Sequence, residues 1–204
     1  KQYVVFSAHH DHLGVGRPVK GDSIYNGALD NASGISMMLN MAKAFSSMNP
    51  KPSRSLVFAA VAAEEYGLLG SQYYAGHPTV PLKDIAANIN TDGLNIWGKT
   101  SDITFLGWER SSMKEDIEAV AGEMGMTISE DAYPEKGFFY RSDHFNFAKV
   151  GVPSLSYEVG NNFIGKPADY SKQVKAKYEE QNYHQPSDEL SKDWLFDGGM
   201  KDCE

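Results

Sequence analysis

Two adjacent glutamates, Glu64 and Glu65, follow an apolar run with the character of a buried strand at residues 55–63. One carboxylate at a strand end is ordinary, but two neighbouring carboxylates repel each other unless a positive charge lies beside them. Neighbours on a regular strand point to opposite faces, so both can serve one site only if the chain is already leaving the strand. The following stretch, YGLLG, is typical of such an exit.

Imidazole and carboxylate side chains also follow the other predicted strands. His9 ends a β-rich run at residues 3–8, Asp30 lies in the loop after it, Asp92 ends a third strand, and His184 follows the last one. In open α/β sheets, ligands bind in the crevice beyond the carboxyl ends of the strands. These residue types supply the nitrogen and oxygen ligands that zinc accepts. A pair of metal ions roughly 3.5–4 Å apart activates water and polarises carbonyl groups in hydrolases.

Asp11 is a candidate partner for His9. The two residues are two positions apart and therefore lie on one face of an extended segment. A ligating histidine usually donates its second N–H to a carboxylate, which fixes its tautomer and orientation. We therefore expect Asp11 to orient His9. Of the two glutamates, one can be a ligand while its neighbour handles the protons of the activated water.

The elements that must position these residues alternate between strands and helices, which favours an α/β fold. Strands are predicted at 3–8, 55–63, 85–93, 102–107 and 152–159, and helices at 34–48, 66–76 and 112–125. In the last helix, the spacing places Ile117, Val120, Ala121 and Met124 inward. Residues 165–181 are polar and are predicted to be an exposed, partly helical excursion. This order predicts a three-layer sandwich with a central mixed, mostly parallel sheet covered on both faces.

The bulk composition predicts one globular domain over residues 1–204. Apolar residues make up 41% of the 204 residues, and the net charge of −8 argues against a nucleic-acid partner. No run approaches the roughly 18 apolar residues needed to span a membrane. The single Cys203 excludes an internal disulfide framework. The chain starts on a strand at Lys1 without methionine, so we expect a piece of a longer protein. No feature predicts an oligomeric state.

Motifs along nearly the whole chain resemble those of the co-catalytic dizinc aminopeptidases of the bacterial leucyl aminopeptidase type. They are VVFSAHHDHLG, NGALDNASG, FAAVAAEEYGLLGS, NINTDG, RSDHFNFAKVGVP and YHQPSDEL. Relatives of that family include glutamate carboxypeptidase and glutaminyl cyclase. The resemblance implies a zinc exopeptidase fold of the phosphorylase/hydrolase-like kind, two Zn²⁺ ions per chain, peptide substrates, and a secreted or periplasmic location.

The resemblance also implies a ligand set. Asp30, Glu65 and His184 resemble the ligands of one zinc ion. His9 and Asp92 resemble the ligands of the other ion, with Asp30 shared between the two.

Further roles follow from the same resemblance. Glu64 resembles the general base and acid, and Asp11 the partner of the first histidine ligand. Tyr183 resembles a tyrosine that stabilises the oxyanion in some members, and Arg141 resembles a substrate-contacting arginine. The family often has a cis peptide bond after the shared aspartate, which is the Asp30–Asn31 bond of this chain.

Three alternatives remain at this stage. A carboxypeptidase of the same fold needs cationic groups for a terminal carboxylate, and Arg141 is the obvious candidate. A single-zinc glutaminyl cyclase would not need His9 as a ligand. A non-catalytic, receptor-like domain would keep the fold and would be expected to have lost ligands.

The other histidines have plainer interpretations. His10, His12 and His77 are predicted to be structural or surface residues, since histidine is commonly of intermediate burial. His144 is open to both interpretations, because Asp143 could orient it near the crevice.

Overall fold

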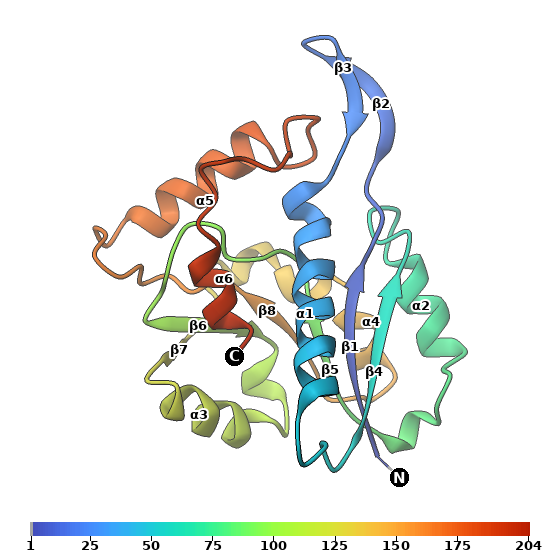
Figure 1. Cartoon of the computed structure of the whole chain (residues 1–204). Coiled ribbons are helices and arrows are strands. Elements are labelled where there is room, and N and C mark those ends of the chain that lie inside the picture. The colour runs from blue at the N-terminus through green and yellow to red at the C-terminus, as the bar shows by residue number, and fades with distance from the viewer. Residues whose placement is uncertain (1) are drawn as a thin grey trace.

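The computed structural model describes residues 2–204, and its central six-stranded sheet confirms the predicted architecture (Figure 1). The strands, in their order across the sheet, are β4 (Ser55–Val61), β1 (Tyr3–His9), β5 (Ile85–Thr91), β8 (Ser154–Glu158), β6 (Asp102–Leu106) and β7 (Thr127–Ser129). All neighbouring strands are parallel except β6 and β8, which are antiparallel. The sheet is therefore mixed and mostly parallel, as predicted.

Helices cover both faces of this sheet. The helices of the described chain are α1 (Gly34–Ser47), α2 (Leu69–Gly76), α3 (Lys114–Glu123), α4 (His144–Lys149), α5 (Tyr170–Gln181) and α6 (Phe196–Asp202), and α5 lies beyond the strand ends (Figure 1). Strand β1 shows how the layers form, because alternate side chains of a strand point to opposite faces. Phe6 and Ala8 pack with Met38 of α1, whereas Val5 packs with Phe147 of α4 on the other face. None of the helices described in residues 2–204 is long and apolar enough to cross a membrane.

Several elements differ from the predictions. The glycine-rich loop after β1 forms a hairpin of β2 (Gly14–Val19) and β3 (Asp22–Tyr25), which projects from the body (Figure 1). Strand β7 and helices α4 and α6 arise in segments for which no element was predicted. The prediction that Val120 points inward is wrong, because its side chain is 53% exposed. Helix α3 buries only a narrow stripe around Ala121. Val120, one residue earlier in the chain, lies about 100° around the helix from that stripe.

The start of α1 is packed tightly against the turn η1 (Ala28–Ser33), which carries Asp30. Asn31 is 1% exposed, and its amide nitrogen donates a hydrogen bond to the carbonyl of Thr91 at 3.0 Å. Its amide oxygen accepts hydrogen bonds from the N–H groups of Gly34 and Gly93, at 3.0 and 2.9 Å. Asn31 therefore ties the turn to the carboxyl end of β5. The Asp30–Asn31 peptide bond is cis, as the resemblance implied.

We predict that Gly34→Ala lowers the free energy of unfolding by about 1–3 kcal/mol, the usual cost of overpacking. A Cβ at Gly34 would lie 2.1 Å from the side-chain oxygen of Asn31 and 2.6 Å from the carbonyl oxygen of Thr91. Gly122→Ala in α3 is the matched control, because nothing lies within 4 Å of the added Cβ. The control should gain up to about 1 kcal/mol from helix propensity. Urea unfolding of both variants tests this, and equal effects would contradict it.

Candidate metal centre

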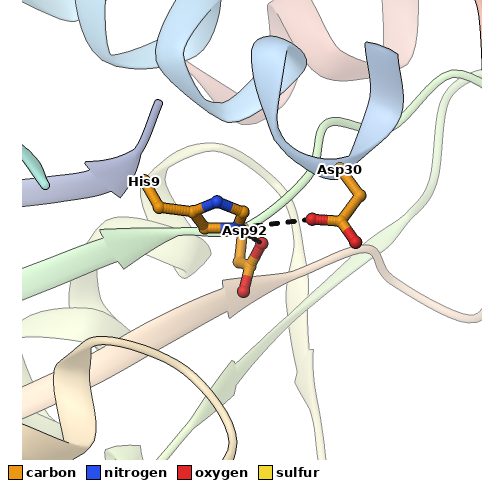
Figure 2. A group of neighbouring side chains, drawn as sticks. All are labelled: His9, Asp30 and Asp92. Carbon is orange, nitrogen blue, oxygen red and sulfur yellow. Dashed lines mark hydrogen bonds and ion pairs between the residues drawn. The ribbon is translucent and has the colours of Figure 1, made fainter. Parts of the chain in front are cut away.

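His9, at the end of β1, lies between two carboxylates. Its Nε2 atom is 3.3 Å from Oδ1 of Asp30 and 3.1 Å from Oδ1 of Asp92 (Figure 2). The sheet explains the second contact, because Ser7 pairs with Asn90 in the parallel register of β1 and β5. Two residues further along each strand, His9 therefore lies beside Asp92. The Asp30 carboxylate reaches the same imidazole from the turn before α1.

A second group of ligand-type atoms lies on the other side of Asp30. His184 Nε2 is 3.3 Å from Oδ2 of Asp30 and 2.9 Å from Oε2 of Glu65. His12 Nδ1 lies 2.7 Å from the remaining glutamate oxygen, Oε1. Asp30 thus presents one oxygen to each group. The structure brings together all five residues that the sequence predicted as metal ligands.

The chain leaves β4 just before the two glutamates. The strand ends at Val61, and Ala63 adopts a positive φ of 58°. The two carboxylates therefore escape the strand alternation, and both line one cavity of about 300 Å³ next to Asp92. Burial, reinforced by the negative charge of Asp92, raises the pKa of Glu64 to about 9. This carboxyl group therefore holds a proton when no cation lies beside it.

The spacing of these atoms fits a divalent metal ion. Zinc bonds of about 2.0–2.2 Å in tetrahedral geometry place ligand atoms about 3.3–3.6 Å apart, close to the 2.9–3.3 Å separations seen here. His184 Nε2 is buried near two carboxylates yet makes no hydrogen bond to any described residue. A nitrogen directed at a shared cation, rather than at either oxygen, explains that orientation. Among the described residues, two sets have ligand atoms close enough to hold an ion: His9, Asp30 and Asp92, and His12, Asp30 and Glu65. His184 Nε2 lies beside the second set.

The charge balance within the site points the same way. Burial lowers the pKa of His9, but the carboxylates of Asp30 and Asp92 outweigh this effect and raise it to about 12. Burial likewise raises the pKa of Asp30, but the imidazoles of His184 and His9 outweigh it and leave the pKa well below its usual range. Protons on the imidazoles therefore balance the carboxylates when no metal is bound. Metal binding must displace those protons.

Asp11 lies beside His9, but its backbone is the direct partner. His9 Nδ1 is 3.0 Å from the carbonyl oxygen of Asp11, whereas the nearer carboxylate oxygen is 4.0 Å away. The other carboxylate oxygen accepts a hydrogen bond from the N–H of Ala63 at 2.7 Å. Asp11 therefore orients the imidazole through its main chain. Its side chain holds the strand exit that places Glu64.

Three residues that sequence reasoning did not assign to the site support it. Asp188 accepts hydrogen bonds from the N–H groups of Leu29 and Asp30, each at 3.0 Å. Ser142 donates a hydrogen bond to Oδ2 of Asp92 at 2.7 Å. His12, predicted to be structural or on the surface, instead lies against Glu65. The signals were weak, because His12 and Asp188 stand near ligands in HHDH and HQPSD, Ser142 stands in RSDH, which holds no ligand, and none of the three has a spacing of its own.

Tyr183 and Arg141 lie at the cavity that contains the cluster. Tyr183 is 45% exposed, and its ring stacks on that of His184 with centroids 3.9 Å apart. Burial and the negative charges of Asp30 and Glu65 raise its pKa, so the phenol keeps its proton and can donate it in a hydrogen bond. Arg141 is exposed and lines the same cavity. His10 and His77 are also exposed, and they belong to neither ligand group.

Comparison with known proteins identifies the family. The sequence matches Peptidase family M28 over residues 1–199, and the chain belongs to that family. It is 33% identical to aminopeptidase YwaD of Bacillus subtilis (strain 168) over 140 residues, which is 66% of this chain and 29% of that protein. The chain therefore spans less than a third of this curated relative.

Solved structures give the same fold. A zinc aminopeptidase from Bacillus subtilis, BSAP, aligns with a TM-score of 0.57 and 25% identity, covering 95% of this chain and 50% of that one. The LapA aminopeptidase of Legionella pneumophila aligns with a TM-score of 0.67 over 100% of this chain and 48% of its own. Its identity of 18% supports the fold alone.

The structure favours a structural rather than a catalytic role for His144. It is fully buried in α4, belongs to neither ligand group, and packs edge-to-face on Phe139 with centroids 4.9 Å apart. Burial lowers its pKa to about 4. The imidazole is therefore neutral in the folded protein near pH 7.

We predict that His144 makes the protein sensitive to acid. Between pH 6.5 and about 4 the unfolded chain binds the proton and the folded chain does not, so stability present above pH 6.5 is lost as the pH falls through this window. The loss amounts to about 3 kcal/mol. In His144→Gln, the difference in unfolding free energy between pH 7 and pH 4.5 should shrink. His77→Gln, at an exposed site, should behave like the wild type, and an unchanged pH dependence in His144→Gln would refute the assignment.

Proposed function

We propose that this chain is the catalytic region of a zinc-dependent aminopeptidase that removes N-terminal residues from peptides. One observation carries the proposal. The two carboxylate oxygens of Asp30 face two separate groups of ligand atoms, one around His9 and one around His184. That arrangement suits a pair of ions sharing one carboxylate. Membership of a peptidase family and the resemblance to named aminopeptidases support the choice of reaction.

Five side chains would hold the metal. Asp30, Glu65 and His184 would bind one zinc ion, and His9, Asp30 and Asp92 the other, with His12 supporting Glu65 from its outer oxygen. When bound, a zinc pair supplies Lewis acidity, which polarises a carbonyl group and lowers the pKa of water. This chain's residues would supply the proton transfers and the orientation of the substrate.

Glu64 is placed to move protons. It lines the same cavity as Glu65 and Asp92, and its carboxyl group is buried enough to hold a proton without a cation nearby. In the proposed reaction, Glu64 takes a proton from the attacking water and passes it to the amine that leaves. The protonated phenol of Tyr183 would donate a hydrogen bond to the oxyanion that develops on the scissile carbonyl.

The charges around the cavity favour a substrate with a free amino terminus. The acidic residues lining it are Asp30, Glu64, Glu65, Asp92, Glu158 and Glu179. Only two cationic residues line it within the described chain, Arg141 and Lys175. A carboxypeptidase would instead need an excess of cationic residues in this cavity, to bind the terminal carboxylate of its substrate. The position of His9 within the cluster argues against a single-zinc cyclase, which would not need it.

We predict that the metal-free protein binds zinc at a stoichiometry near two per chain. Asp30→Ala should abolish measurable binding at one site and weaken the other strongly, because the shared carboxylate serves both. Calorimetric titration measures this, and Asp116→Ala on the exposed side of α3 is the control. A wild-type stoichiometry of one, or an Asp30→Ala variant with unchanged binding, would rule out the shared site.

We predict that Glu64→Gln keeps its zinc and loses turnover by about 10²–10⁴-fold, because the amide cannot accept a proton. Hydrolysis of amino-acid p-nitroanilides, with metal content measured on the same sample, checks both parts. N-blocked peptides offered to the wild type should resist hydrolysis, because the proposed reaction needs a free amino terminus. Unchanged turnover in the variant would remove Glu64 from the mechanism.

A further inference from the structure

The cavity beside the metal centre extends away from it between the ends of the strands and α5. Its volume of about 300 Å³ is at the lower end of the range for small-ligand pockets. Its apolar lining comes from Leu29, Leu94, Trp97, Leu106, Phe138 and Val159. Asp30, Glu64 and Asp92 also line the cavity, and the scissile bond would lie beside them. The rest can receive a side chain of the substrate.

Glu158 is a half-buried acid in this otherwise largely apolar wall. It is the last residue of β8, and because Tyr157 pairs with Thr91, it lies beside Asp92 at the end of the neighbouring strand. Its carboxylate makes no hydrogen bond or ion pair with any other residue in the described range 2–204. Burial, partly opposed by the charge of Lys175, raises its pKa to about 7. A cationic ligand beside this group would favour its charged form.

The cations of the cavity are less available than this acid. Lys175, from α5, donates hydrogen bonds to the carbonyl of Val159 at 2.9 Å and to the side-chain oxygen of Asn161 at 3.2 Å. Two of its three N–H groups are therefore held by the loop after β8. Arg141 is exposed, and its guanidinium lies over the ring of Phe138, 5.6 Å from the centroid. The charge of Lys175 acts on Glu158, but the two groups make no direct ion pair in the described range, so the carboxyl group of Glu158 stays open to a ligand.

We propose that this cavity binds the side chain of the substrate's N-terminal residue and that Glu158 selects a cationic side chain, lysine or arginine. The inference rests on the aminopeptidase function proposed above and names its substrate class. The apolar stem of such a side chain would lie against Leu106 and Phe138, with its charged end at the carboxylate. A charge-assisted hydrogen bond to the partly buried acid is stronger than one between neutral groups.

The test compares lysine with norleucine, which has a similar aliphatic stem and lacks the ammonium group. The zinc-loaded protein is assayed with the p-nitroanilides of lysine, norleucine and glutamate. We expect kcat/KM for lysine to exceed that for norleucine by about tenfold or more. In Glu158→Gln this ratio should fall towards one. Because the ratio is measured within each variant, a partial loss of folded protein cancels.

Glu180→Gln is the control, since Glu180 is an exposed acid on α5 that does not line the cavity, and it should keep the wild-type ratio. A wild-type ratio near one, or a ratio unchanged by Glu158→Gln, would overturn the selectivity and leave the aminopeptidase function standing. A preference for glutamate that is lost in Lys175→Met would also overturn it, by assigning the cavity to acidic side chains. Failure to hydrolyse any of the three substrates would overturn both proposals.

Discussion

The carboxylate of Asp30 is the constraint on which the site depends. One oxygen lies 3.3 Å from the imidazole of His9, and the other lies 3.3 Å from the imidazole of His184. Each group adds one more carboxylate, from Asp92 or from Glu65. Negative charges at such separations disfavour one another unless cations or protonated imidazoles lie between them. The position of the Asp30 side chain therefore determines which positive charges can balance the carboxylates of the site.

The surrounding framework is built around that placement. The turn that carries Asp30 is held from one side by the buried amide of Asn31, which joins it to β5 and to the start of α1. Asp188 holds it from the other side by accepting two of its backbone N–H groups, and also accepts a hydrogen bond from Tyr178 of α5. The turn thus touches the sheet, a helix and the cavity wall. A small shift in any of them would move the shared carboxylate.

The same sheet edge supplies both the proposed reaction and the proposed selectivity. Asp92 and Glu158 lie next to each other at the carboxyl ends of the neighbouring strands β5 and β8. The first contacts His9 and Ser142, whereas the second makes no hydrogen bond or ion pair with the described residues, although the charge of Lys175 acts on it. Acids of the same type therefore have different tasks because their neighbours differ. In our proposal, Asp92 helps to hold the metal and Glu158 meets the substrate.

By itself, the sequence predicted a metal-binding cluster and the order of the main elements. Residue types near strand ends predicted a metal-binding cluster, and the family resemblance implied that its ligands are His9, Asp30, Glu65, Asp92 and His184. The alternation of strands and helices predicted the sheet. Both predictions depend on local sequence patterns, which can be recognised without the tertiary structure. The exit from β4 before the two glutamates was also readable, because a short helix-like segment follows at once.

Only the tertiary structure decided which atoms face which. The roles of His12 and Asp188, the use of the Asp11 carbonyl in place of its carboxylate, and the exposure of Val120 all depend on contacts between distant segments. The lack of a hydrogen bond or ion pair to Glu158 among the described residues is of the same kind, since a missing contact has no local signature. Spacing along a chain places a residue on a face, but contact geometry is set by how whole elements pack.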